Sequence, residues 1–392
     1  MKHCLTLFFL FSFFIGLSQS SETYILVKNS TNDLPIANVQ ILAIASKRAG
    51  KTNEAGVFRV VSPNALQLEL SHPEFVTVHL NTEVLTETFN IIYLDPLPAT
   101  PYLPFVPAFS SYDVLSHLIQ NSKNKIAQSS LLQAYVLEFF KLDSILTSFN
   151  DGDLNYYINP KRKGVTTDIV INQHRFENVL KQTSDQEIMG FNLNTLLENA
   201  YNFTYLESFL NKKHLEKYQI SYWQDAVNPE LNKIKLDPLP TTVEALFAIE
   251  IIYDEKHMLI KSFSGQIPKD LIAYSQPKNR KREKQRLLQT AFDARYAVGA
   301  NLYHLTFLTE KIKVRKNLKN NERHDFEVLN FLDVQSVSYP QPSYSKFHEF
   351  RQKSLNKLPS KFYNYYWETS KQLPLTTKQE QFIQPKLLPL ER

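Results

Sequence analysis

The fold of this chain is indicated first by two stretches near its N-terminus, Leu34-Pro35-Ile36-Ala37-Asn38-Val39 and Thr52-Asn53-Glu54-Ala55-Gly56-Val57-Phe58. The first opens a run rich in Val and Ile, which favours a β-strand. In the second, Asn53 and Gly56 tolerate the positive φ that a tight turn requires, and an apolar run follows at residues 57–61. The two stretches therefore predict short strands joined by tight turns.

The same pattern extends to both sides of these stretches. The first apolar run closes at the turn formers Asn29 and Asn32, and later runs are equally short. About six short strands in roughly 75 residues predict a small antiparallel β-sandwich over residues 22–96. The predicted strands are 24–27, 36–44, 57–61, 66–70, 76–80 and 89–94.

A strand followed by Pro-x-x-x-Val, Thr-[Asp/Asn]-x-x-Gly-x-Phe and a later strand near residues 72–75 resembles the carboxypeptidase regulatory-like (prealbumin-like) domain of Bacteroidetes envelope proteins. The usual Gly-Tyr near the later strand is replaced here by Pro73-Glu74-Phe75. The resemblance implies a prealbumin-like sandwich and an envelope location. Because the motif shapes a turn and fills a core, it implies no activity. The matching residues are Pro35, Val39, Thr52, Asn53, Gly56 and Phe58.

Residues 1–20 combine Lys2 with an apolar run at 5–17 and the small residues Ser18 and Ser20. This is the pattern of a secretory signal peptide. At about 13 residues, the run is shorter than the roughly 20 residues that span a bilayer, so a signal is favoured over an anchor. We therefore expect an exported chain, periplasmic or associated with the outer membrane or cell surface, with no transmembrane span after processing.

Composition excludes several classes of function. Cys4 precedes the apolar run, so it is not the lipid-bearing cysteine of a lipoprotein, and the processed chain has no cysteine for disulfides, thiolate chemistry or metal binding. A formal net charge of +5 on 392 residues is too mild to mark a nucleic-acid-binding protein. Neither G-x-x-x-x-G-K-[ST] nor G-x-G-x-x-G occurs, and we expect no cofactor.

Proline is dense just after the predicted sandwich. It holds the backbone extended and removes the N–H groups that strand pairing needs, so a linker is predicted at residues 97–110. The rest of the chain, 111–392, is then a larger domain of unknown function. The prolines in and beside the linker are Pro96, Pro98, Pro101, Pro104 and Pro107.

The larger domain is predicted to be α+β. Apolar residues at helical spacing predict a helix over 111–126, N-capped by Ser110 or Ser111, and a helical segment over 192–217 broken near Asn202. The remaining strand signals predict a long-stranded antiparallel sheet, so the whole chain is mainly β with some α. The predicted strands are 131–143, 144–158, 165–171, 219–223, 233–236, 245–253, 257–263, 294–309, 312–315 and 325–337.

Several local features carry their own predictions. Asn150-Asp151-Gly152-Asp153 favours a hairpin turn over a calcium loop, because its glycine falls too early for an EF-hand. The run 246–252 is apolar on both faces, which indicates a strand that is covered on both sides. The basic stretch 278–286 is read as a solvated loop, with contact to an anionic envelope glycan or lipid as the alternative. The aromatic cluster 362–367 is read as a core anchor, with carbohydrate stacking as the alternative.

One constellation suggests a zinc peptidase. His174-Arg175-Phe176-Glu177 fits the H-x-x-E half of a zinc carboxypeptidase site, and His304 can be placed as the third ligand. However, His174 lies in a predicted turn, and His304 lies in a predicted strand on a face with Leu308. In such peptidases the regulatory domain also follows the catalytic one, and neither H-E-x-x-H nor G-x-S-x-G occurs. We therefore expect no metal site and no catalytic residues.

Three functions remain. The leading prediction is a non-enzymatic envelope protein, with the sandwich as spacer or docking module and the larger domain binding an envelope protein, glycan or lipid. The alternative is a carrier of an apolar, lipid-like ligand beneath helices on a curved sheet; the zinc peptidase comes third. An open apolar cavity would favour the carrier, a packed core the binding protein, and converging His and Glu side chains the enzyme.

Overall fold

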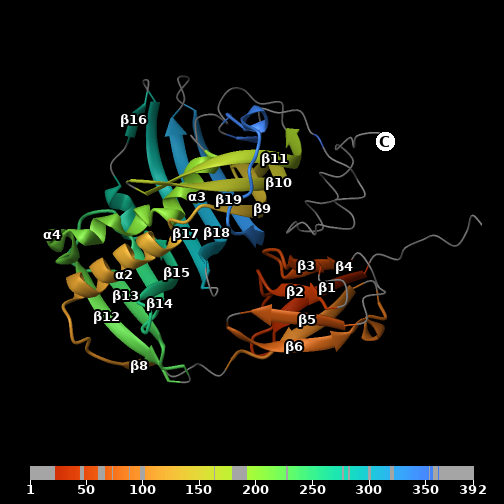
Figure 1. The fold of residues 1–392 in the computed structure, drawn as a ribbon, viewed down its shortest axis with the longest axis horizontal. Coiled ribbons are helices and arrows are strands. Elements are labelled where there is room, and N and C mark those ends of the chain that lie inside the picture. The colour runs from red at the N-terminus through yellow and green to blue at the C-terminus, as the bar shows by residue number, and fades with distance from the viewer. Residues whose placement is uncertain are drawn as a thin grey trace, which may run out of the picture. The chain divides into compact units, whose positions relative to one another are not determined.

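In the computed structural model, the described residues form two compact units, one within residues 23–97 and one within residues 102–361 (Figure 1). The signal-peptide prediction for residues 1–20 and the aromatic cluster at 362–367 lie outside the described residues. In the part that is described, no helix is both long and apolar enough to cross a bilayer. The structure describes residues 23–44, 48–60, 67–72, 74–87, 89–97, 102–162, 164–178, 192–226, 228–275, 278–280, 283–298, 302–317, 322–352, 354, 355 and 361.

The first unit is a sandwich of two sheets, as the sequence predicts, but it is not antiparallel throughout. One sheet has the order β4-β1-β7, with β1 antiparallel to β4 and parallel to β7; the other has the order β3-β2-β5-β6 and is antiparallel. Apolar side chains of both sheets, among them Ile25, Ile41 and Leu70, form one core. The elements are β1 (Thr23–Asn29), β2 (Gln40–Ala43), β3 (Arg48–Lys51), β4 (Val57–Val60), β5 (Gln67–His72), β6 (Phe75–Asn81), η1 (Thr82–Val84) and β7 (Phe89–Leu94). Strand β3 was not predicted, because its sequence is polar.

The motif at residues 34–58 holds the sandwich together locally. The buried Thr52 hydroxyl accepts a hydrogen bond from the Val39 N–H at 2.9 Å and donates one to the Ile36 carbonyl at 2.8 Å. Pro35, next to Ile36, forms an isolated antiparallel β-bridge with Lys28 through the backbone. These bonds tie the two motif stretches to each other.

The turn before β4 depends on Asn53 and Gly56. The Asn53 side-chain oxygen accepts hydrogen bonds from two backbone N–H groups of the turn, at 2.9 and 3.0 Å. Gly56 has a φ of +72°, and a Cβ there would lie 2.6 Å from the Val27 carbonyl oxygen. The turn aims Phe58 into the core.

The helices of the second unit lie where the sequence predicts them. Helix α2 (Ser111–Ile126) is capped by Ser110, whose hydroxyl accepts a hydrogen bond from the Asp113 N–H at 3.2 Å. The second helical segment does break at Asn202. It consists of α3 (Leu193–Tyr201), η3 (Thr204–Leu210) and α4 (Lys212–Leu215).

These helices pack on one face of a large antiparallel sheet, which we call the inner face; the opposite side is the outer face (Figure 1). Its order is β11-β10-β9-β19-β18-β17-β15-β14-β13-β12-β8, with β16 paired to β17. The elements are β8 (Tyr102–Pro104), β9 (Ser130–Leu142), β10 (Ile145–Lys161), β11 (Gly164–Asn178), β12 (Tyr218–Asp225), β13 (Leu231–Pro238), β14 (Ala248–Asp254), β15 (Leu259–Gln266), η4 (Leu271–Tyr274), β16 (Lys278–Arg280), β17 (Glu283–Val298), β18 (Tyr303–Asn317), β19 (Arg323–Ser338) and η5 (Lys346–His348).

One predicted turn and one predicted strand are wrong. The hairpin predicted at residues 150–153 is the middle of β10, and the actual turn uses Asp143 and Ser144, both with positive φ. The local preference for a turn is overridden here, because polar side chains within 150–153 form hydrogen bonds or ion pairs with residues on neighbouring strands. The single strand predicted at 294–309 is instead the end of β17 and the start of β18, which pair with each other.

Two predicted loops contain strands. Part of the proline-rich linker forms β8, which pairs with β12 at the sheet edge, where a missing N–H can face away from the ladder. The basic stretch also contains β16, paired with β17.

Strand β14 alternates between buried and partly exposed residues, so the prediction of a strand covered on both faces is wrong.

Candidate functional site

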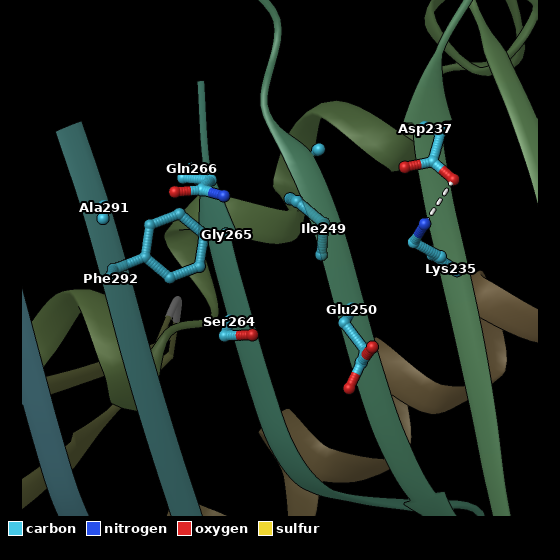
Figure 2. A pocket seen from close by; sticks show the side chains of 10 residues that line it. Lys235, Asp237, Ile249, Glu250, Ser264, Gly265, Gln266, Ala291 and Phe292 are labelled. Atoms are coloured by element: carbon cyan, nitrogen blue, oxygen red, sulfur yellow. Dashed lines mark ion pairs between the residues drawn. The ribbon is translucent and has the colours of Figure 1, made fainter. Parts of the chain in front are cut away.

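A groove of about 330 Å³ lies on the sheet of the second unit, across β13, β14, β15 and β17 (Figure 2). Its residues come from four adjacent strands and are set by the pairing register. Lys235 lies opposite Glu250, which lies opposite Ser264. Two residues before Glu250 on β14, Ala248 lies opposite Gln266. The lining residues are Lys235, Asp237, Ala248, Ile249, Glu250, Ser264, Gly265, Gln266, Ala291 and Phe292.

The floor of the groove is the backbone of the sheet, and the side chains beneath it point to the inner face. Ile249, Gly265 and Phe292 are consecutive partners across three strands. A Cβ at Gly265 would lie 2.6 Å from Phe292 Cζ, so the ring occupies the space that a side chain there would need. The Phe292 ring stacks on Tyr205 of η3 at 4.2 Å between centroids. The helices thus hold the floor in place from the inner face.

The walls are polar, and their charges are largely paired. The Lys235 ammonium lies 3.1 Å from the Asp237 carboxylate (Figure 2), and Lys233 lies 3.3 Å from Glu250. The Lys235 and Asp237 side chains remain about half exposed, at 50% and 43%. An incoming polar ligand therefore meets carboxylate, ammonium, amide and hydroxyl groups beside the small side chains of Ala248 and Ala291.

Sequence reasoning identified β13, β14 and most of β15, but neither the part of β17 that carries Ala291 and Phe292 nor the groove. A signal was available, because Lys233 and Lys235 and then Ser262 and Ser264 alternate with apolar residues. That period of two marks a polar outer face. The prediction of an apolar strand covered on both sides obscured it.

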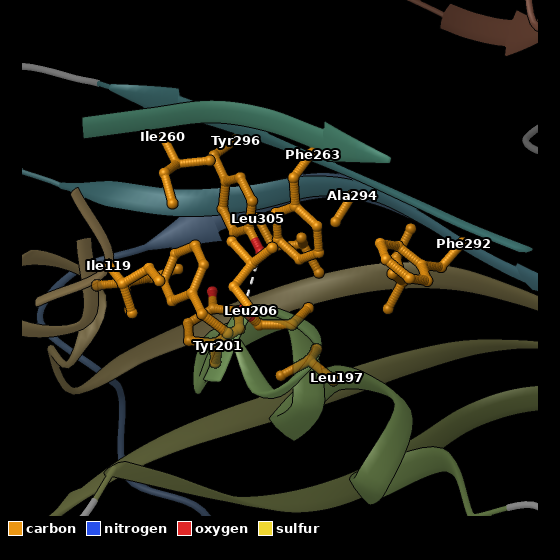
Figure 3. Close-up of a cluster of buried hydrophobic side chains, with 14 of the residues drawn as sticks. Ile119, Leu197, Tyr201, Leu206, Ile260, Phe263, Phe292, Ala294, Tyr296 and Leu305 are labelled. Carbon is orange, nitrogen blue, oxygen red and sulfur yellow. Dashed lines mark hydrogen bonds between the residues drawn. The ribbon is translucent and has the colours of Figure 1, made fainter. Parts of the chain in front are cut away.

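The inner face carries the main core, between the helices and the sheet (Figure 3). The rings of Phe203 and Tyr296 stack at 5.3 Å between centroids, and Phe263 packs against both. The Tyr296 hydroxyl donates a hydrogen bond to the Ala200 carbonyl of α3 at 2.8 Å. This part of the interface is filled by side chains.

Beyond that core, a row of polar side chains crosses four strands. Glu310, Asn330, Glu138 and Asn150 are consecutive partners on β18, β19, β9 and β10. The Asn150 amide donates to Glu138 Oε2 at 2.8 Å and the Ser354 hydroxyl donates to it at 3.0 Å. Burial raises the pKa of Glu138 to about 7 although both bonds oppose the rise. The buried Glu138 carboxyl therefore has a pKa close to neutral pH.

Glu310 has a similar environment. The hydroxyl of Tyr205, from η3, donates a hydrogen bond to Glu310. Burial raises the pKa of Glu310, opposed by Tyr205 and Asn330. The row therefore holds two carboxyl groups with raised pKa on one sheet face, separated by Asn330.

Asp151 takes part in a buried ion pair and not in a turn or calcium loop. Arg175 Nη2 lies 2.6 Å from Asp151 Oδ2, and Arg175 Nε lies 3.0 Å from Oδ1. The Tyr135 hydroxyl donates to Asp151 Oδ2 at 2.9 Å. Both charged side chains are at most 1% exposed. The pair fastens β10 to β11.

The structure does not bring the residues of the hypothetical zinc site together. His174 is not in a turn but in β11, opposite Gly152, while His304 lies in β18. Four strand spacings separate β11 from β18, on the order of 15–20 Å. Among the residues that the structure describes, no three His, Cys, Asp or Glu side chains gather as a metal site requires.

A bulge also changes the predicted setting of His304. Leu305 lies opposite Tyr296 and Phe307 lies opposite Arg295, so Thr306 is an extra residue on β18. As a result, Leu305 and Leu308 both join the inner core. His304 and Leu308 therefore do not share a face, contrary to the sequence-based prediction.

No protein-family model and no curated protein matches this sequence. Among solved structures, lipovitellin aligns with a TM-score of 0.23 and 9% identity over 56% of this chain and 26% of its own. This chain therefore spans only about a quarter of that protein. A DUF1329 family protein from Desulfovibrio piger aligns with a TM-score of 0.20 and 11% identity, over 58% of this chain and 91% of its own. At TM-scores below 0.5, neither likeness carries a functional argument.

Proposed function

We propose that this chain is a non-enzymatic envelope protein whose second unit binds a saccharide of an envelope glycan in the groove across β13, β14, β15 and β17. The observation that carries this proposal is a groove on the outer face in which the methyl groups of Ala248 and Ala291 lie among carboxylate, ammonium, amide and hydroxyl side chains. A sugar ring has the same two characters, because its C–H face is apolar and its edge carries hydroxyl groups.

The size and the charges of the groove agree with such a ligand. A volume of about 330 Å³ lies at the small end of ligand pockets, which run from about 300 to 1,000 Å³. Lys235 and Glu250 each have an oppositely charged neighbour, so the groove presents little net charge. Neutral hydroxyl groups can both donate to the carboxylates and accept from the ammonium groups.

The first unit supports the proposal as a spacer or docking module. Its motif residues serve a turn and a core, and the carboxypeptidase regulatory-like resemblance adds an envelope location. Export is part of the same proposal, with cleavage between Ser18 and Ser21. Intact-mass analysis of the envelope fraction tests it, and a full-length chain in the cytosol would contradict it.

The carrier of an apolar ligand is the second candidate. Its support is the architecture itself, in which helices α2 and α3 cover one face of a long-stranded sheet. A lipid chain would have to displace stacked rings such as Phe203 and Tyr296. The groove needs no such rearrangement, so the saccharide-binding protein is the better-supported function.

The test is a titration of the processed protein with envelope glycan fragments by calorimetry. Ala248→Phe places a ring in the groove, and we expect affinity to fall about tenfold or more. Ile252→Phe is the matched control, because it adds the same ring on the same strand outside the lining residues. Absence of glycan binding, or equal affinity in the two variants, would refute the proposal.

A further inference from the structure

A second surface of the second unit, distant in sequence from the groove, carries an exposed aromatic residue. After β19 the chain runs along the edge strand β11, where Glu349 bridges to Val170 and the Phe350 N–H donates to the Ile169 carbonyl at 2.7 Å. The turn η5 projects from this segment, and its Phe347 side chain is 90% exposed.

The turn is held firmly on both sides. Before it, Tyr344 stacks on Tyr157 of β10 at 3.9 Å between ring centroids, and its hydroxyl donates to Asp168. After it, Phe350 packs against the main core. Because the flanking aromatic residues are anchored, Phe347 points outward from an ordered turn, and the exposure is not that of a loose end.

The surroundings of Phe347 are basic. Lys346, His348 and Arg351 are all exposed, and Arg351 is 76% exposed at its side chain. The nearest acid in sequence, Glu349, lies 3.8 Å from Arg351 and is only 25% exposed. Within residues 346–352, Lys346 and Arg351 stand against this single acid.

A groove of about 610 Å³ lies at the same place. Val170, Ile171 and Phe350 contribute apolar surface to it, and Lys346, His348 and Arg351 contribute positive or protonatable groups. A ligand that fits this lining has an apolar part joined to an anionic part. A single exposed apolar side chain is ordinary on a protein surface, but one that stands among cations and above such a groove is not.

We propose that the Phe347 turn docks onto the surface of an anionic lipid bilayer. Phe347 enters the boundary between headgroups and acyl chains, while Lys346 and Arg351 contact the anionic headgroups. One aromatic ring and two or three cations give weak and reversible attachment, comparable to other single-anchor surfaces. This contact goes beyond the glycan-binding proposal and does not depend on it.

The test is co-sedimentation of the processed protein with vesicles of phosphatidylcholine alone or mixed with phosphatidylglycerol. We expect binding to the mixed vesicles only, weakened as salt rises. Phe347→Ser should lower the partition coefficient about tenfold, and Lys346→Glu with Arg351→Glu should abolish binding. The matched control is Val106→Ser, because Val106 is 93% exposed and lies away from this basic surface in sequence.

Each outcome decides the proposal. Equal binding of the Phe347→Ser variant and the wild type would overturn it, since the attraction would then be charge alone. Binding to dextran sulfate as tightly as to vesicles would overturn it in favour of a free anionic polymer. No vesicle binding would also overturn it. Urea unfolding of the Phe347→Ser protein should match the wild type, which shows that the variant is folded. Calorimetry with glycan then tests the first proposal separately.

Discussion

Replacing Arg175 with Met should destabilise the second unit strongly. Arg175 is 1% exposed and its partner Asp151 is fully buried, with two short contacts between them. Met keeps an unbranched apolar stem but leaves the Asp151 carboxylate with the Tyr135 hydroxyl as its remaining bond among those described above. An uncompensated buried charge of this kind costs about 3–5 kcal/mol.

The double variant Arg175→Met with Asp151→Leu provides the control. Because it removes both charges, it should recover most of the lost stability and lie within about 1–2 kcal/mol of the wild type. Urea unfolding followed by far-UV circular dichroism measures the four proteins of the double-mutant cycle, which are the wild type, the two single variants and the double variant. A loss below about 1 kcal/mol for Arg175→Met, or a double variant as unstable as the sum of the singles, would refute the reasoning.

Three further predictions concern pH, backbone conformation and metal binding. Because burial raises the pKa of Glu138 from 4.5 to about 7, the folded state keeps a proton that the unfolded chain loses. Stability should therefore fall by about 3 kcal/mol as pH rises from about 4.5 to 7, and Glu138→Gln should flatten this slope in urea titrations. Gly56→Ala should destabilise the sandwich by about 1–3 kcal/mol in thermal unfolding, because of its positive φ and the contact with Val27; an unchanged midpoint would contradict this. The processed protein should contain no stoichiometric zinc by elemental analysis, whereas about one equivalent that disappears in His174→Ala would restore the peptidase hypothesis.

Elements with a strong local signal were predictable from the sequence. Helix α2 has a polar cap and a regular apolar stripe, and both its ends were placed correctly. The break at Asn202 was also clear, because turn-forming asparagine interrupts the apolar spacing. In both cases the deciding contacts lie within one or two turns of the chain.

Elements decided by distant partners were not predictable. Asn150 and Asp151 favour a turn when considered alone, but Glu138 and Arg175 from neighbouring strands give them hydrogen bonds inside the sheet. The groove was missed for the same reason. Its floor requires Gly265 to lie opposite Phe292, and that register becomes visible only when β15 and β17 are paired.

The order of strands in the second unit has a consequence for how the chain acquires its structure. Strands β9 to β11 follow one another as neighbours, and β12 to β19 run along the sheet almost in sequence order, so each block consists of local hairpins. Among the described strands, the two blocks pair with each other where β9 lies beside β19, across about 200 residues of chain. The sheet therefore cannot be completed until nearly the whole chain is present and able to fold. A chain that ends before residue 323 would leave β9 and β18 with open edges, ready to pair with other molecules and aggregate.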